Sequence, residues 1–151
     1  MTILLSVINA FIFTIISGFH FYWAMGGKRG ADVVLPSNIS GKKALLPSKL
    51  ITFIVAFVFL SFAIFYLINV DLIDFKLPKL ISNYGLFALA IILMIRAVGD
   101  FKYVGFSKKI KNTPFAEYDT KYYSPLCLYL GLTTLIIQSL NWLNNFLVFV
   151  H

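Results

Sequence analysis

Four apolar stretches, each about 20 residues long and nearly free of charge, constrain most strongly what this sequence can fold into. They cover residues 3–24, 51–70, 81–99 and 126–148. At about 1.5 Å per residue, each stretch is long enough to cross the ~30 Å hydrocarbon core of a bilayer as a helix. The sequence therefore predicts an all-α integral membrane protein, a four-helix bundle that forms one transmembrane domain over residues 1–151.

The composition excludes a water-soluble fold and offers little for metal or redox chemistry. Hydrophobic residues make up 60% of the chain and charged residues 13%, where a soluble domain has about a quarter charged. The mean hydropathy is +0.86. The single cysteine, Cys127, cannot form an internal disulfide, and no His or Cys spacing is typical of a zinc or haem site. No metal and no cofactor are predicted.

The basic residues predict the orientation in the membrane. The first and third loops carry most of the Lys and Arg residues, whereas the second loop has two lysines offset by two aspartates. The positive-inside rule places the two basic loops in the cytoplasm, so both termini are expected outside (N-out/C-out). The net charge of +7 suits anionic lipid headgroups at these loops, and no nucleic-acid partner is predicted. The residues concerned are Lys28, Arg29, Lys42, Lys43 and Lys49 in the first loop, and Lys102, Lys108, Lys109, Lys111 and Lys121 in the third.

Polar residues within the spans recur at helical spacing and so fall on single faces. Lipid offers no hydrogen bonds, so such faces are expected to turn toward the bundle interior. The second span has no comparable stripe and is expected to present the most surface to lipid or to a partner. The predicted interior polar stripe comprises Asn9, Ser17, Thr134, Gln138 and Asn141.

Four residues near the predicted cytoplasmic boundary form the candidate site: His20, Arg96, Asp100 and Tyr103. Counting along the helices places His20 and Asp100 at the same depth. A charge inside a span costs roughly 2.5 to 3.5 kcal/mol at its centre, so Arg96 needs a partner, and Asp100 is the obvious one. Arg before Asp at i, i+4 is the weaker orientation on a helix, so His20 or Lys102 could hold Asp100 instead. Two interpretations stay open: an ion-pair network that joins the first and third spans, or a polar pocket in which His20 and Asp100 pass a proton and Arg96 holds an anionic group.

Three strings of sequence carry a resemblance: HFYWAMGG at 20–27, RAVGDFKYVGF at 96–106 and DTKYYSPLC at 119–127. With them the chain resembles an uncharacterised family of small bacterial four-span membrane proteins, domain of unknown function 3995, over nearly its whole length. The resemblance implies a four-span bundle in a bacterial inner membrane. It implies no established activity, and it makes the three strings a plausible shared site.

Three functions compete. The first is an accessory or interaction subunit of an inner-membrane assembly, with a membrane protein as partner; it is ranked first because nearly the whole chain is membrane span. The second is a membrane-embedded enzyme or a protein that binds a lipophilic ligand in the polar pocket. The third, a transporter, ranks last because neither an inverted repeat nor a broken helix is detectable.

Overall fold

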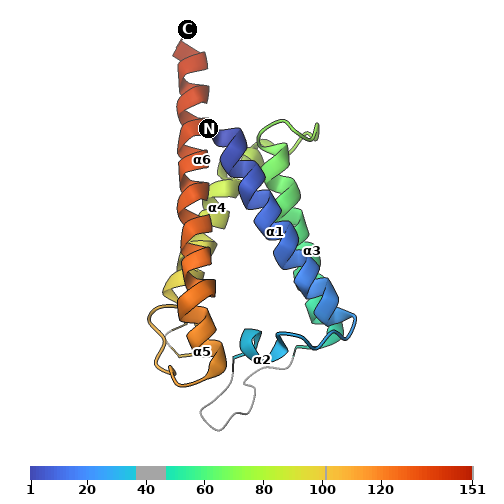
Figure 1. The fold of residues 1–151 in the computed structure, drawn as a ribbon. Helices are drawn as coiled ribbons and strands as arrows, with labels where there is room; N and C mark the ends of the chain where they lie inside the picture. The colour runs from blue at the N-terminus through green and yellow to red at the C-terminus, as the bar shows by residue number, and fades with distance from the viewer. Residues whose placement is uncertain (37–46, 101, 151) are drawn as a thin grey trace.

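The computed structural model describes residues 1–36, 47–100 and 102–150, and it is helical throughout its regular elements (Figure 1). Four long helices, α1 (Thr2–Ala24), α3 (Lys49–Ile68), α4 (Lys79–Val98) and α6 (Ser124–Val150), are apolar enough to cross a membrane. Their ends differ from the predicted spans by only one or two residues. The predicted all-α membrane bundle is therefore confirmed. Lys42 and Lys43 of the first basic loop lie outside the described residues.

The bundle is built from two helical hairpins. Helix α1 packs along α3, and α4 packs along α6. Figure 1 shows the two pairs close together near the N-terminus and the α3–α4 loop, and farther apart at the other end, where the short helices α2 (Ala31–Val34) and α5 (Pro114–Tyr118) lie. Helix α2 contacts α5 and so connects the two pairs at that end.

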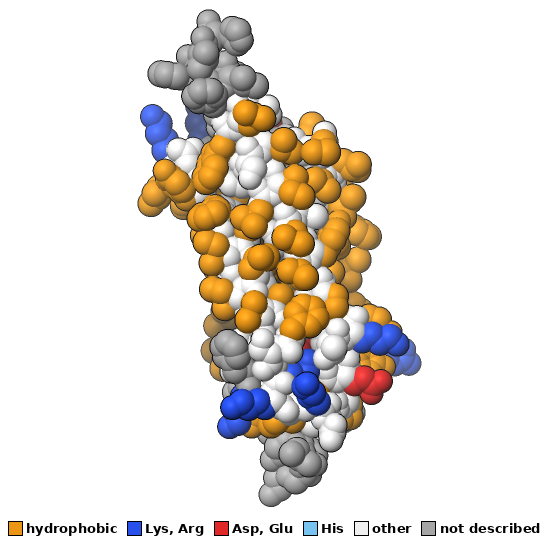
Figure 2. Space-filling model, turned by 90° about the vertical axis from the view of Figure 1, so that its left-hand side faces the viewer, with side chains coloured by type: hydrophobic (Ala, Val, Ile, Leu, Met, Phe, Trp, Pro, Cys, Tyr) orange, Lys and Arg blue, Asp and Glu red, His pale blue; other side chains and the backbone are white. Residues whose placement is uncertain are grey.

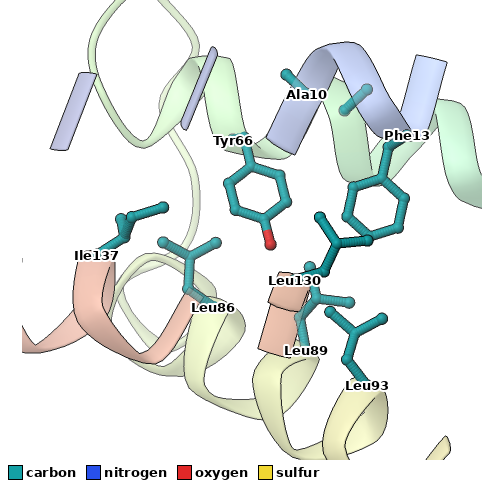
Figure 3. Packing of buried hydrophobic residues seen from close by; sticks show 9 residues of the cluster. Ala10, Phe13, Tyr66, Leu86, Leu89, Leu93, Leu130 and Ile137 are labelled. Atoms are coloured by element: carbon teal, nitrogen blue, oxygen red, sulfur yellow. The ribbon is translucent and has the colours of Figure 1, made fainter. Parts of the chain in front are cut away.

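A small core joins the hairpins where they are close. Phe13 of α1 stacks on Tyr66 of α3, with ring centroids 5.8 Å apart. Figure 3 shows the hydroxyl of Tyr66 pointing toward the α4–α6 hairpin, among leucines of those two helices. That hydroxyl pairs with the hydroxyl of Thr134 on α6. Nearby, the side chains of Asn9 and Thr133 hydrogen-bond at 3.0 Å. Polar pairs within an apolar core thus fix how one hairpin meets the other.

Helix α3 is the most exposed of the four, as the sequence predicts. In its most apolar 18-residue window 17% of the residues are buried, against 28% for α1, 28% for α4 and 33% for the α5–α6 segment. Figure 2 shows one face of the molecule, on which hydrophobic side chains cover the long middle part. Some Lys or Arg side chains lie at the upper left, and more of them lie at the lower end. We call this lower end, which holds α2, α5 and the α4–α5 loop, the basic end. Among the described residues, the exposed cations at this end include Lys28, Arg29, Lys49, Lys102, Lys109, Lys111 and Lys121.

The segment before α6 contains two further helical turns. The short helix α5 begins at Pro114, and the hydroxyl of Thr113 caps it by accepting from the N–H of Ala116. The chain then continues without a break through a π-helical turn, η1 (Asp119–Tyr123), into α6. Pro125 has no N–H to give to the preceding turn, and the wider π turn lies directly before it.

Candidate functional site

The strongest polar constellation lies at the basic end and centres on Asp119, whose side chain is fully buried. Its Oδ1 accepts from Arg96 Nη2 at 2.8 Å, and its Oδ2 accepts from Lys108 Nζ at 2.9 Å. Oδ2 also accepts from the backbone N–H of Gly105 at 2.8 Å and from the hydroxyl of Ser124 at 3.1 Å. We call these five residues the Asp119 cluster. One carboxylate there ties together the end of α4, the α4–α5 loop and the start of α6.

The two cations of the cluster differ in how many of their hydrogen-bond donors have a partner. The side chain of Lys108 is 2% exposed, and its ammonium donates to the carbonyl of Gly105 at 3.0 Å and to the hydroxyl of Thr120 at 2.6 Å as well as to Asp119. All three of its donors are therefore used. The Arg96 side chain is 34% exposed, and its Nη1 is buried without a hydrogen-bond partner among the described residues. With two cations on one carboxylate, the cluster carries a surplus positive charge.

Two glycines allow the loop after α4 to fold back onto that helix. Gly99 has φ +100° and Gly105 has φ +85°, a region that L side chains rarely adopt. A Cβ on Gly105 would lie 2.3 Å from the Cα of Gly99, so the two backbones touch directly. The returning chain donates from Phe106 to the carbonyl of Ala97 at 3.0 Å, which satisfies a carbonyl at the end of α4.

The predicted pairing of Arg96 with Asp100 is wrong, because the carboxyl of Asp100 turns into its own loop. Asp100 follows the left-handed Gly99 and is exposed, and its Oδ1 accepts from the backbone N–H groups of Lys102, Tyr103 and Val104 at 2.7 to 2.9 Å. Its slight burial would raise its pKa, but those three N–H groups outweigh that effect and hold the pKa below its ordinary value. Asp100 therefore organises the loop, and Arg96 turns to Asp119.

The other two candidate residues are held by different contacts. His20 donates from Nδ1 to the carbonyl of Ile16 at 2.8 Å, and its ring lies 5.0 Å from that of Phe59 and 5.2 Å from that of Trp23, measured between centroids. Among the described residues, no hydrogen bond or ion pair joins His20 to Arg96, Asp100 or Tyr103. Tyr103 is half-buried in the α4–α5 loop, with Lys102 Nζ 5.1 Å from its ring centroid.

The predicted interior stripe lies where helices pack against one another. Asn9, Ser17, Thr134 and Gln138 are buried, and Asn141 is half-buried. Ser17 donates to the carbonyl of Ala56 at 2.8 Å, across the α1–α3 pair. Gln138 donates to the carbonyl of Asn83 at 3.1 Å, across the α4–α6 pair. These side chains act between helices.

Sequence reasoning missed Lys108 and Asp119, which it treated only as loop charges. One signal pointed to Asp119, since this acid opens the string DTKYYSPLC at 119–127, which had already been singled out. Among the described residues, no hydrogen bond or ion pair joins the first of the three strings to the Asp119 cluster. Its Tyr22 hydroxyl accepts from the N–H of Arg29 at 3.3 Å, and Trp23 Nε1 donates to the carbonyl of Arg29 at 2.9 Å. Within the described ranges, no three His, Cys, Asp or Glu residues lie close enough to hold a metal.

Comparison with protein families gives one match. The model described as "Protein of unknown function (DUF3995)" matches residues 13–134, which is most of the chain. The chain belongs to the DUF3995 family. The resemblance seen in the sequence is thereby confirmed, and the matched range contains all three strings complete, together with the whole Asp119 cluster. Neither the curated proteins nor the solved structures contain a match to this chain.

Proposed function

We propose that this DUF3995 protein is an interaction subunit of a membrane assembly, and that a transmembrane helix of its partner docks on the outer face of α1. The observation that carries the proposal is a shallow hollow of about 740 Å³ on that face, lined in part by Gly18. Its other lining residues are Ile15, Phe19, Tyr22 and Arg29. A Cβ added at Gly18 would meet nothing within 4 Å, so the hollow is open.

A glycine on a lipid-facing helix allows another helix to approach closely, and this close van der Waals packing drives association in lipid. Thr14 lies one turn from Gly18 on the same face and is exposed too, so the pair has the small-xxx-small spacing. The hydroxyl of Thr14 is already satisfied, because it donates to the carbonyl of Ala10 at 2.8 Å. Large side chains border the small pair, with Phe11 65% and Phe19 54% exposed. The face thus offers a groove between ridges.

The charge of Arg29 restricts which transmembrane helix can bind in the hollow. It lines the hollow at the basic end, so two copies packed symmetrically through Gly18 would bring their Arg29 side chains together, which like-charge repulsion disfavours. A different protein with an acidic residue near the same membrane boundary would complement this charge. The proposed occupant is therefore a transmembrane helix of another membrane protein, with an Asp or Glu at that depth.

The contacts of the candidate site favour this function over a membrane enzyme. Arg96 and Asp100 are engaged in holding the basic end, and His20 lies against Phe59, so no acid–base pair is assembled among them. We further propose that the membrane is the bacterial inner membrane, with the basic end in the cytoplasm and both termini outside, as the positive-inside rule predicts. Anionic headgroups would then meet the exposed lysines.

The test is a mild-detergent purification of the tagged protein from its native membranes, with quantitative mass spectrometry of co-purifying proteins. Gly18→Leu fills the hollow while meeting no neighbour in the isolated chain, so the variant is expected to fold and to lose a stoichiometric partner. Leu132→Phe, a lipid-facing change on α6, is the matched control and is expected to retain the partner. Full retention by Gly18→Leu, or a homodimer as the only assembly recovered, would contradict the proposal.

A further inference from the structure

A second surface, between α3 and α4, lies on a different face from the Gly18 hollow. It is a groove of about 380 Å³ that lies within the apolar, membrane-spanning lengths of both helices. Its walls are apolar except for one serine, and they come from both hairpins. The lining residues are Ser61, Phe62 and Phe65 on α3, and Ile81, Gly85, Ala88, Leu89 and Ile92 on α4.

The groove leads to Arg96. On α4, Gly85, Leu89, Ile92 and Arg96 follow one another at three- and four-residue spacing, which places them on one face of the helix. Ile92 is the lining residue nearest the basic end, and Arg96 lies one turn beyond it. From Gly85 to Arg96 the rise is about 16 Å at 1.5 Å per residue. That is about half of the ~30 Å hydrocarbon core, the depth of one leaflet.

Groups of the protein do not fully neutralise the charge of Arg96. Asp119 takes one hydrogen bond from its guanidinium and is shared with Lys108, so the cluster keeps a surplus positive charge. The guanidinium has five N–H donors, and the single bond to Asp119 is the only hydrogen bond it makes to described residues. The side chain is 34% exposed although its Nη1 is buried, and arginine is a residue that proteins commonly use to bind phosphate.

We infer that the α3–α4 groove and Arg96 together bind one anionic phospholipid, its phosphate at Arg96 and an acyl chain along Ile92, Leu89 and Gly85. The apolar walls and the leaflet-length rise accommodate the chain, and the surplus positive charge selects the headgroup. This inference stands apart from the proposed partner, because the Gly18 hollow is on another helix and contributes no residue to the groove.

The test measures phospholipid retained by the full-length protein purified in mild detergent, after exchange into micelles containing phosphatidylglycerol or phosphatidylcholine. Wild type is expected to retain about one phosphatidylglycerol per chain and to prefer it about tenfold over phosphatidylcholine. Ala88→Trp blocks the groove without touching the Asp119 cluster and is expected to lower retention about tenfold. Leu132→Trp, on the lipid face of α6, is the control and is expected to retain the lipid.

Arg96→Lys tests the headgroup separately, because lysine can still pair with Asp119 but cannot bind phosphate bidentately. The preference for phosphatidylglycerol is expected to fall while the chain stays folded. Equal retention of both lipids by wild type, or undiminished retention by Ala88→Trp, would overturn the inference. Thermal stabilisation by inorganic phosphate alone that matches stabilisation by phosphatidylglycerol would also overturn it, in favour of a free anion.

Discussion

Replacing Asp119 with asparagine removes the charge that holds the basic end and leaves the shape of the side chain almost unchanged. The carboxylate accepts four hydrogen bonds, two of them from cations. A hydrogen bond to a charged group contributes about 1.5 to 3 kcal/mol. We apply this in full to Lys108, whose side chain is 2% exposed, and discount it for Arg96, which is 34% exposed. The expected loss is about 3 to 5 kcal/mol, in line with removing one partner of a buried pair.

The assay is equilibrium unfolding of the purified protein in detergent, with a double-mutant cycle. Lys108→Met removes the buried ammonium and keeps a side chain of similar length. In the Asp119→Asn background it leaves one fewer buried charge unpaired, so the double variant is expected to be more stable than the sum of the two single changes predicts. A loss below about 1 kcal/mol for Asp119→Asn, or strict additivity in the cycle, would refute the view that the carboxylate neutralises a buried cation.

Three further substitutions and one pH titration test other parts of the molecule. Gly105→Ala places a Cβ 2.3 Å from a neighbouring glycine Cα at a φ of +85°, so amide hydrogen exchange in the α4–α5 loop is expected to accelerate while exchange in α1 is unchanged. Thr134→Val removes the hydroxyl that pairs with Tyr66 and is expected to lower the free energy of unfolding by about 1 kcal/mol, whereas an unchanged stability would show that the pair contributes nothing between the hairpins. Asp100 has a lowered pKa, so its support of the loop is complete above the unfolded pKa of about 4 and is lost as the pH falls through the lower folded pKa. The Asp100 Cγ chemical shift in NMR should therefore titrate at a lower pH in the folded protein than in the unfolded chain. Lys76→Cys, made with the native cysteine replaced by serine, is expected to react with a membrane-impermeant maleimide from outside the cell, and labelling only after lysis would reverse the orientation.

The positions of the four spans were predictable because hydropathy depends on local composition, and each span is a continuous apolar run. The burial of Asn9 and Ser17 also followed, since one helical face carried them both and lipid cannot satisfy them. The partner of Arg96 was not predictable in this way. Asp119 lies 23 residues after Arg96 in the chain. The path of the loop between them depends on glycines with positive φ, and hydrophobic periodicity carries no information about that path.

The same reasoning explains why the predicted site was only partly assembled. Counting residues along α1 and α4 compares depth in the membrane, but it does not give the distance between the two hairpins. His20 therefore shares a predicted level with Asp100 and nevertheless contacts α3, because α1 packs along α3. The burial of Lys108 was not predictable from the sequence either. In a loop rich in lysines nothing distinguishes it from its exposed neighbours, and only the structure shows that a buried carboxylate lies beside it.

The Asp119 cluster accounts for how an arginine can stay at this depth and remain available to a ligand. Without a counter-charge, Arg96 would be costly near the membrane boundary. With an exclusive carboxylate partner, it would be neutralised and would have no reason to attract an anion. Arg96 and Lys108 share Asp119, and this arrangement is intermediate between the two cases. The carboxylate fixes the direction of the guanidinium, but one positive charge of the cluster is not neutralised. Lys108→Met should therefore weaken phosphatidylglycerol retention although Lys108 lines no part of the groove, whereas a purely structural role for the cluster would leave retention by the folded variant unchanged.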